Sequence, residues 1–404
     1  MIDVRITQPH EYRLADTPLA ISLLDTPPDD ERWNRSLPSW DESVSFSAWD
    51  GDTCVGHACQ FPVDTTVPGG GRLSTGAVSR VGVLPTHRRR GVATRLMHAL
   101  IDDALRRHVV LLSLRASEAI IYPRYGFGVA GEYCAVTIDP ARATPLRGAT
   151  TDGSFRILDP DEIVGVIDPL YERVGHRRPG ALTRPPSFTE RLLRAAIERK
   201  DASFVAVHLD PSSEPDGYVH YDLNWRGAAL EISSGEGVVH DLFAASDEVE
   251  LALWQFLFDT DLVTSWRASA RPLDDLVRFA AADRRGHQQV GIQDEQWLRL
   301  LDVDAALSAR SYHPATGSIA IRVSDPLVPA NNATWRIDAD GADRTSDAPD
   351  LSVGIETLSA AYLGGPSWAA LAGTGAVEVA GGQATEVADT LFASRPLPFC
   401  GTFF

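Results

Sequence analysis

Residues 81–96 constrain the fold of this 404-residue chain most, and they read VGVLPTHRRRGVATRL. The apolar run before Pro85 predicts a strand, because proline cannot donate to a β-ladder and is typical of strand ends. After the turn, apolar residues at helical spacing predict one buried helix face, at Val92, Leu96, Met97, Leu100, Ile101 and Ala104. Residues 109–114 form a short apolar run, as expected of a strand buried on both faces. Together these segments predict one βαβ unit.

The turn between the strand and the helix predicts an anion-binding site. Free backbone N–H groups converge at the first turn of a helix, where a phosphate can accept several hydrogen bonds. Gly91 lets the backbone come close, and Arg88, Arg89 and Arg90 add positive charge. Three adjacent arginines are also common on solvated surfaces, so the prediction depends on their place between a strand and an amphipathic helix. We expect a pyrophosphate to bind here.

The spacing Arg88-x-x-Gly91-x-Ala93 resembles the coenzyme A signature of the GNAT N-acetyltransferase superfamily. This resemblance implies acetyl-CoA as the acyl donor, with its pantetheine arm on the strand backbone and its pyrophosphate on the arginine turn. The expected donor-binding residues are Val81, Gly82, Val83, Arg88, Arg89, Arg90, Gly91, Val92 and Ala93, with Ser117 and Glu118 beyond the second strand.

Residues 114–128, LRASEAIIYPRYGFG, narrow the resemblance further. Together with the preceding THRRRG they are similar to the Eis (enhanced intracellular survival) family of bacterial acetyltransferases, known for acylating aminoglycosides and lysine amines. The resemblance implies that Tyr122 is the general acid that protonates the departing thiolate. The alternative is a core tyrosine whose hydroxyl bonds a polar neighbour. We expect Tyr125 and Phe127 to be packing residues.

The chain ends in the aromatic sequence FCGTFF, residues 399–404. In the Eis family the last residue enters the acetyltransferase site, which implies a catalytic role for the α-carboxylate of Phe404. That group is ionised at neutral pH and can attract an ammonium or accept a proton through water. The alternative is a frayed tail. The family has an acidic residue where this chain has Phe403, so we expect a different substrate preference there.

The net charge of −18 argues against nucleic acids and anionic membranes as partners and favours a cationic amine substrate. Acid beside tryptophan in residues 25–42 is one way to bind such a cation. A solvated loop around Pro27-Pro28 is an equally good interpretation. Among these residues (Asp25, Asp29, Asp30, Glu31, Trp33, Trp40, Asp41 and Glu42), we expect Asp25 and Trp33, together with Arg80, to bind the amine.

Cysteine usage and the start of the chain predict a cytoplasmic protein. The four cysteines form no CxxC pair, and the first residues lack the layout of a signal peptide. Cys54, His57 and Cys59 lie close enough to suggest metal ligands, but a strand over residues 53–61 would place Cys54 on the opposite face from the other two. We therefore expect no metal.

The length predicts two to three domains of mixed α/β and α+β architecture. The first, residues 1–148, is the catalytic GNAT domain, and the second, residues 149–286, loosely repeats its βαβ pattern. The repeat has a strand over 238–244, a helix starting near Val249 and a strand over 262–266.

The repeat differs from the first unit at its turn. Asp247 and Glu248 stand where a pyrophosphate would bind, so we expect a GNAT-like fold without a cofactor and one active site per chain.

The third domain, residues 287–404, resembles the sterol-carrier-protein-like fold that closes Eis-family chains, on the sequence TLSAAYLGGPSWAALAGTGAVEVA. A helix is predicted over residues 298–312. Strands are predicted over 317–323, 334–337, 351–355 and 376–379, and helices over 358–363, 368–371 and 384–392. Family resemblance also implies a homohexamer.

These features predict an acetyl-CoA-dependent N-acetyltransferase that acylates small cationic amines such as aminoglycosides by direct transfer in a ternary complex. One alternative is an acetyltransferase for protein lysines or polyamines. An alternative of another class is a noncatalytic carrier or scaffold that binds an apolar ligand in the third domain.

Overall fold

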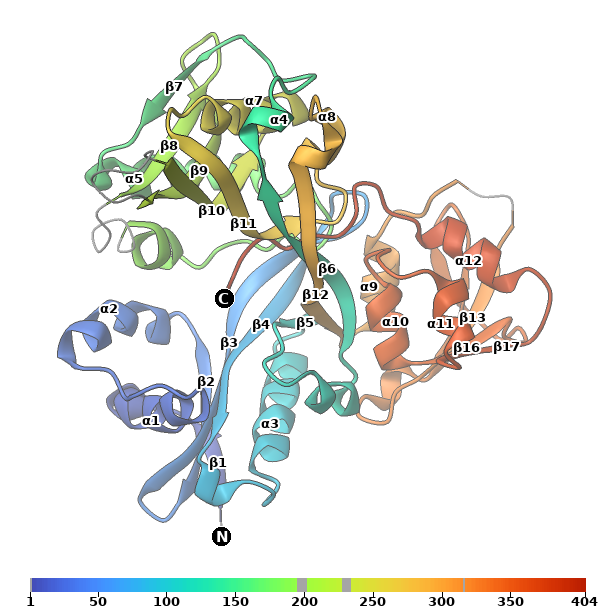
Figure 1. The fold of residues 1–404 in the computed structure, drawn as a ribbon. Helices are drawn as coiled ribbons and strands as arrows, with labels where there is room; N and C mark the ends of the chain where they lie inside the picture. The colour runs from blue at the N-terminus through green and yellow to red at the C-terminus, as the bar shows by residue number, and fades with distance from the viewer. Residues whose placement is uncertain (1, 195–201, 227–233, 315–316) are drawn as a thin grey trace.

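The computed structural model describes residues 2–194, 202–226, 234–314 and 317–404 (Figure 1). The strands are β1 (Asp3–Ile6), β2 (Val44–Asp50), β3 (Thr53–Thr66), β4 (Arg72–Val83), β5 (Leu111–Leu114), β6 (Gly128–Ile138), β7 (Ser154–Ile157), β8 (Ser203–Leu209), β9 (Pro215–Arg226), β10 (Ser234–Ala244), β11 (Val263–Pro272), β12 (His287–Leu300), β13 (Ile319–Ser324), β14 (Ala333–Ile337), β15 (Ala342–Thr345), β16 (Leu351–Gly354) and β17 (Val377–Val379). One sheet has the order β1-β2-β3-β4-β5-β12-β6-β11-β10-β9-β8-β7, and a second has the order β15-β14-β13-β16-β17.

The α-helices lie on the faces of these sheets. They are α1 (Tyr12–Ser22), α2 (Asp30–Asp41), α3 (Val92–Arg106), α4 (Pro140–Ala143), α5 (Ile163–Val174), α7 (Asp247–Phe258), α8 (Val277–Ala280), α9 (Val303–Ala309), α10 (Ile355–Ala361), α11 (Trp368–Gly373) and α12 (Ala384–Phe392). In the part of the chain that the structure describes, no helix is both long and apolar enough to cross a membrane.

The βαβ unit predicted from the first domain is confirmed. Strands β4 and β5 pair in parallel, from Thr75 opposite Leu111 to Val78 opposite Leu114, and α3 connects them. The helix buries the apolar face that its sequence spacing predicts. Helix α3 covers one face of this part of the sheet, and α1 and α2 cover the other (Figure 1).

The predicted repeat is confirmed as well. Strands β10 and β11 pair in parallel, and α7 connects them. Ser246 caps α7, because its hydroxyl accepts a hydrogen bond from the Val249 N–H at 3.3 Å. The two units share one continuous sheet, since β6 of the first pairs with β11 of the second.

The helix predicted over residues 298–312 is wrong at its start and too long at its end, since α9 ends at Ala309. Strand β12 runs to Leu300 between β5 and β6, and α9 begins only at Val303, after the cap residue Asp302. The second half of β12 is buried but includes polar residues such as Glu295 and Arg299. Polar residues that find partners inside the protein thus stand at buried positions, so the sequence of the strand does not alternate between apolar and polar residues. Residues 287–300 thus lie in the large sheet.

The third domain is built on the smaller sheet. Strands β13, β14, β16 and β17 and helices α10, α11 and α12 lie where the sequence predicts them, with shifted ends, whereas β15 was not predicted. Its core includes Trp335, Tyr362 and Phe392. Gly128 of β6 packs against α10 so closely that an added Cβ would lie 2.0 Å from the Glu356 carbonyl oxygen. The third domain is therefore docked on the central sheet.

The prediction that Cys54 lies on the opposite face of its strand from His57 and Cys59 is also wrong. The pairing of β2 and β3 shifts register between Ala48 and Trp49, which is a β-bulge. As a result Val55 and Gly56 both face α3. Cys54 instead packs in the α1–α2 cluster that contains Trp40, against which the His57 ring also packs, at 4.8 Å between centroids. A bulge of this kind leaves no mark on the apolar pattern.

Candidate active site

Strands β4 and β5 separate in the first domain, which leaves one edge of β4 open. Their pairing ends at Val78 and Leu114. Strand β4 continues to Val83, paired on its other side with β3. Beyond Val78, no strand in the described ranges pairs with β4 on the β5 side. The backbone of Val81 to Val83, which the family resemblance implies as the place of the pantetheine arm, therefore has an edge with no strand beside it in the described residues.

A buried histidine holds a bulge in β4 just before this edge. Arg80 has a left-handed backbone, with φ 53°, and its carbonyl oxygen lies 3.0 Å from Nδ1 of His57. Since a carbonyl only accepts, Nδ1 carries the proton and donates it. His57 is fully buried, and this burial lowers its pKa to about 3. The neutral ring thus fixes the bend that directs β4 towards the turn.

The turn before α3 has the shape and charge of an anion site. Arg89 and the N-cap residue Gly91 both have left-handed backbones, with φ values of 61° and 75°, and no side chain caps the helix. An added Cβ at Gly91 would meet nothing within 4 Å, so the space over the helix end is open. Uncapped N–H groups beside open space fit a pyrophosphate.

The arginine side chains around this turn are exposed. Arg88 lies 3.6 Å from Glu118, and Arg90 lies 3.9 Å from Asp50. Among the described residues, no carboxylate lies within ion-pair distance of Arg89. Of the other predicted donor-binding residues, Gly82 and Val92 are buried, Val81, Val83 and Ala93 are half-buried, and Ser117 is exposed. The structure brings Glu118 to Arg88, so the turn before α3 and the segment that follows β5 meet here.

Tyr122 lies in the turn between β5 and β6. It is only 5% exposed, with its ring 6.0 Å from that of Phe127 and 6.3 Å from that of Trp297. Burial raises the pKa of the Tyr122 phenol, and the Ser117 hydroxyl opposes this in part. The phenol is therefore protonated at neutral pH and can donate a proton. The packing role predicted for Tyr125 and Phe127 is confirmed, since both are buried.

Arg299 of β12 packs against this turn and connects it to the third domain. Gly126 has φ 84°, and an added Cβ there would lie 2.6 Å from Nε of Arg299. Arg299 is fully buried and donates to both carboxylate oxygens of Asp325, at 2.7 and 2.8 Å. Because Asp325 follows β13, the position of the tyrosine turn depends on how the third domain is docked.

The carboxy terminus is anchored, which argues against the frayed tail. It crosses from the third domain to the first and ends beside β3 (Figure 1). The Phe404 ring packs against a cluster on β3 and β4 that includes Phe61 and Ala77. Ala77 immediately precedes Val78, where β4 and β5 part. Phe403, by contrast, is 68% exposed. The chain end thus lies next to the open edge of β4.

The residues expected to bind the amine lie in different surroundings. Trp33 is buried, 5.8 Å from the Trp40 ring, and the Arg80 guanidinium lies over the same ring at 4.6 Å. Asp25 is near the surface and pairs with Arg32. The structure thus brings Trp33 and Arg80 together on Trp40 and leaves Asp25 to its own ion pair.

Two acids near these tryptophans have surroundings that the sequence did not predict. Glu42, one of the acids grouped with the tryptophans, accepts hydrogen bonds from the Ser187 N–H and hydroxyl, at 2.8 and 2.6 Å, and so links α2 to the second domain. Asp16 on α1 was not singled out from sequence. It is half-buried, and burial raises its pKa, while Arg80 nearby opposes this. A lone acid on a mixed helix gives no pattern that would identify it.

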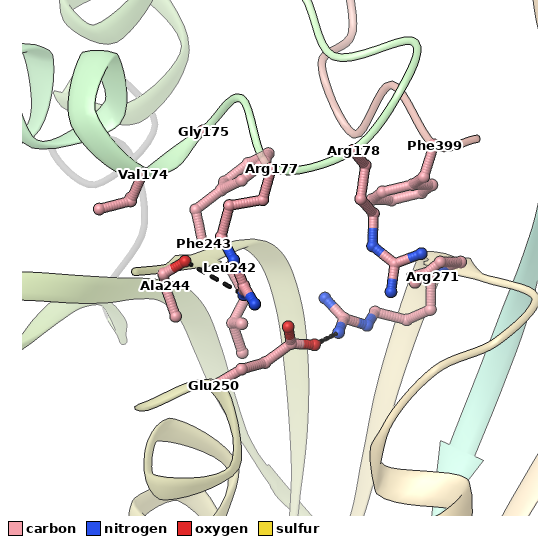
Figure 2. A pocket seen from close by; sticks show the side chains of 11 residues that line it. Val174, Gly175, Arg177, Arg178, Leu242, Phe243, Ala244, Glu250, Arg271 and Phe399 are labelled. Atoms are coloured by element: carbon pink, nitrogen blue, oxygen red, sulfur yellow. Dashed lines mark hydrogen bonds and ion pairs between the residues drawn. The ribbon is translucent and has the colours of Figure 1, made fainter. Parts of the chain in front are cut away.

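A cavity in the second domain lies beside the end of β10, the strand that corresponds to β4 in the repeat. It also borders α7 and β11. Figure 2 shows the guanidinium groups of Arg177, Arg178 and Arg271 around it. Each is neutralised by an acid. Arg177 pairs with Asp247, Arg178 with Asp274 at 2.6 Å, and Arg271 with Glu250 and with Asp275 at 2.8 Å. This cavity lacks the open, uncapped helix end of the first domain.

Three ranges of the chain match known domain families. Residues 3–130 and residues 180–300 each match a family described as an acetyltransferase (GNAT) domain, and residues 303–401 match the sterol carrier protein domain. These ranges place β12 with the second acetyltransferase domain.

Relatives match over most of the chain. A protein of Streptomyces avermitilis named as an uncharacterized N-acetyltransferase is 33% identical over 98% of each chain. The N-acetyltransferase Eis of Mycobacterium tuberculosis is 31% identical over 87% of this chain and 86% of its own. The crystal structure of Eis1 from Mycobacterium abscessus covers 100% of both chains with 34% identity and a TM-score of 0.89.

Proposed function

The chain belongs to the Eis-like N-acetyltransferases of the GNAT superfamily, and we propose that it transfers an acetyl group from acetyl-CoA to an amine of a small cationic substrate such as an aminoglycoside. Acetyltransferase activity follows from the family, and the GNAT fold suggests an acyl-CoA co-substrate. The observation that carries the finer proposal is the open edge of β4, which leads directly into the uncapped arginine turn.

The donor would bind along this edge. The backbone of Val81 and Val83 would pair with the amide groups of the pantetheine arm, as a neighbouring strand does. The first-turn N–H groups of α3, with Arg88 and Arg89, would hold the pyrophosphate. The second domain would not bind a donor, because Ser246 caps the start of α7, the first turn of that helix is acidic, and acids neutralise the arginines of the nearby cavity. One active site per chain follows.

Tyr122 would donate one proton during the transfer, and the α-carboxylate of Phe404 would accept another. The neutral amine nitrogen forms a bond to the thioester carbonyl carbon, and the carbon–sulfur bond breaks. Tyr122 donates its phenol proton to the departing sulfur, and its raised pKa keeps that proton available. The nitrogen loses one proton, which the Phe404 carboxylate accepts directly or through water. Holding both reactants in register supplies much of the acceleration.

The negative charge of the protein supports a cationic amine as the substrate that accepts the acetyl group. The chain carries a net charge of −18, so its surface attracts cations over some distance. Asp16 lies on α1, which covers the sheet face opposite α3, and Asp25 follows α1 in the chain. A half-buried carboxylate such as Asp16 gains more from an ammonium than an exposed one does, because water screens it less.

A thiol-release assay with a panel of amines tests this proposal. Purified protein is mixed with acetyl-CoA and an aminoglycoside, a lysine-containing peptide or a linear polyamine, and free thiol is followed over time. We expect turnover with the aminoglycoside, with mass spectrometry showing added acetyl groups. Turnover with the peptide or the polyamine alone would contradict the aminoglycoside assignment and support the lysine or polyamine alternative. No turnover with any amine would contradict the proposed reaction.

A further inference from the structure

The last six residues are held along their length by groups from other parts of the chain. The Phe399 N–H donates to the Pro179 carbonyl at 2.9 Å. The Thr402 hydroxyl lies 3.0 Å from the Tyr171 hydroxyl and accepts a hydrogen bond from Nε of Arg184 at 3.4 Å. A tail with this many fixed partners has one conformation. Its course therefore serves to bring the chain end to a defined place.

The strongest hold is a buried carboxylate in the middle of the large sheet. Glu295 of β12 is fully buried. Its two oxygens accept the backbone N–H groups of Cys400 and Gly401, each at 2.8 Å. Gly401 has φ 65°, and an added Cβ would lie 2.8 Å from the Phe399 ring. Glycine is therefore required for the tail to turn onto this carboxylate.

Arg115 completes the arrangement from the active-site side. It directly follows β5, at the point where β5 leaves β4, and its Nη2 donates to Oε1 of Glu295 at 2.8 Å. Its guanidinium also lies 5.4 Å from the Phe403 ring centroid. Arg115 thus contacts both the carboxylate that holds the tail and the residue before the chain end.

Burying a charge is unfavourable unless it is paired and hydrogen-bonded. The acid here is satisfied by the tail backbone and by Arg115, whereas the same position could hold an apolar residue if it served the sheet alone. From Gly401 to Phe404 the chain can span at most about 11 Å. Fixing the Gly401 N–H therefore limits where the terminal carboxylate can lie.

We infer that Glu295 and Arg115 are positioning residues that hold the α-carboxylate of Phe404 at the acetyltransferase site. This inference rests on the proposed function of that carboxylate. Neither side chain needs to touch a substrate, because both act through the tail backbone. Glu295 lies 105 residues from Cys400 in sequence, and Arg115 follows a strand of the catalytic unit. Glu295 and Arg115, with the N–H groups of Cys400 and Gly401, form what we call the tail clamp. This clamp links the chain end directly to the point where β4 and β5 separate.

Glu295→Gln tests the inference, with the exposed Glu132→Gln on the neighbouring strand β6 as the matched control. A glutamine amide offers one acceptor oxygen, so one tail N–H loses its partner. We expect kcat to fall about tenfold, with the Kd for CoA unchanged. Carboxypeptidase should release Phe404 about tenfold faster, measured by intact mass. Arg115→Met should act in the same direction, and thermal unfolding of each variant checks that it is folded.

A chain ending at Phe403 separates positioning from mere structural damage. In this shortened chain the Glu295→Gln substitution should cause no further loss of activity, since the α-carboxylate of Phe404 is gone and the new one, on Phe403, ends one residue short of the site. An equal loss in the full and shortened chains, or an unchanged rate of Phe404 release, would overturn the inference alone. Full activity of the shortened chain would refute the proposed role of the carboxylate, and the inference with it.

Discussion

Replacing Arg88 and Arg89 together by alanine should weaken CoA binding without unfolding the protein. Both side chains flank the uncapped end of α3, and both are exposed, Arg88 with 66% of its side chain accessible. Their removal leaves no buried group unpaired, because Arg88 meets only the exposed Glu118. The substitutions should therefore lower the affinity for CoA and leave the stability of the fold unchanged.

The size of the effect follows from this exposure. A charge-assisted hydrogen bond contributes about 1.5–3 kcal/mol where water is partly excluded. At a solvated turn each arginine contributes nearer about 1 kcal/mol. Two arginines then contribute about 2 kcal/mol, or a roughly 30-fold increase in Kd. Binding should weaken but persist, because the backbone N–H groups of α3 remain.

Isothermal titration of CoA into the double variant measures this directly. Arg106→Ala is the matched control. This arginine lies at the other end of α3, is 69% exposed and pairs with Asp103 at 3.3 Å. The control should bind CoA as the parent does. The parent should also lose more affinity than the double variant when salt is raised. An unchanged Kd in the double variant would refute the assignment of the pyrophosphate to this turn.

Three further predictions concern the acid, the β4 bulge and the domain contact. Tyr122→Phe should lower kcat by roughly 10²–10⁴-fold with CoA affinity unchanged, while Tyr125→Phe should lower it far less; near-normal turnover would remove Tyr122 from the mechanism. The folded-state pKa of His57 is about 3, below that of the unfolded chain, so stability should fall as pH drops from about 6.5 towards 3, by up to about 1.4 kcal/mol per pH unit. Urea unfolding at pH 7 and 5 should show a smaller drop for His57→Gln, and an identical drop would contradict this. Gly128→Ala, whose Cβ would meet the Glu356 carbonyl oxygen at 2.0 Å, should destabilise by about 3 kcal/mol, whereas Gly291→Ala, with nothing within 4 Å, should not; equal thermal midpoints would contradict the close contact.

Much of the architecture could be predicted because its units are local. The spacing of apolar residues in α3 and the short apolar run of β5 depend on near neighbours only. The same holds for the second βαβ unit and for most of the third domain. The turn from Arg88 to Gly91 and the start of α3 could also be predicted, since these residues are contiguous, and pyrophosphate binding there stays a prediction.

The parts that could not be predicted depend on distant contacts or on local irregularity. Strand β12 was mistaken in part for a helix because its buried half includes Glu295 and Arg299, whose partners lie far away in sequence. The bulge at Val55 and Gly56 inverted the expected face of Cys54. The tail clamp joins Glu295 to a segment about a hundred residues further along the chain, and neither segment alone predicts this contact.

A crystal structure of the protein with bound CoA tests the central claim most directly. The account predicts the pyrophosphate at the Arg88–Gly91 turn, the pantetheine arm along the open edge of β4, and the thiol between the Tyr122 hydroxyl and the Phe404 carboxylate. CoA bound in the second domain, or a chain end turned away from the thiol, would contradict it.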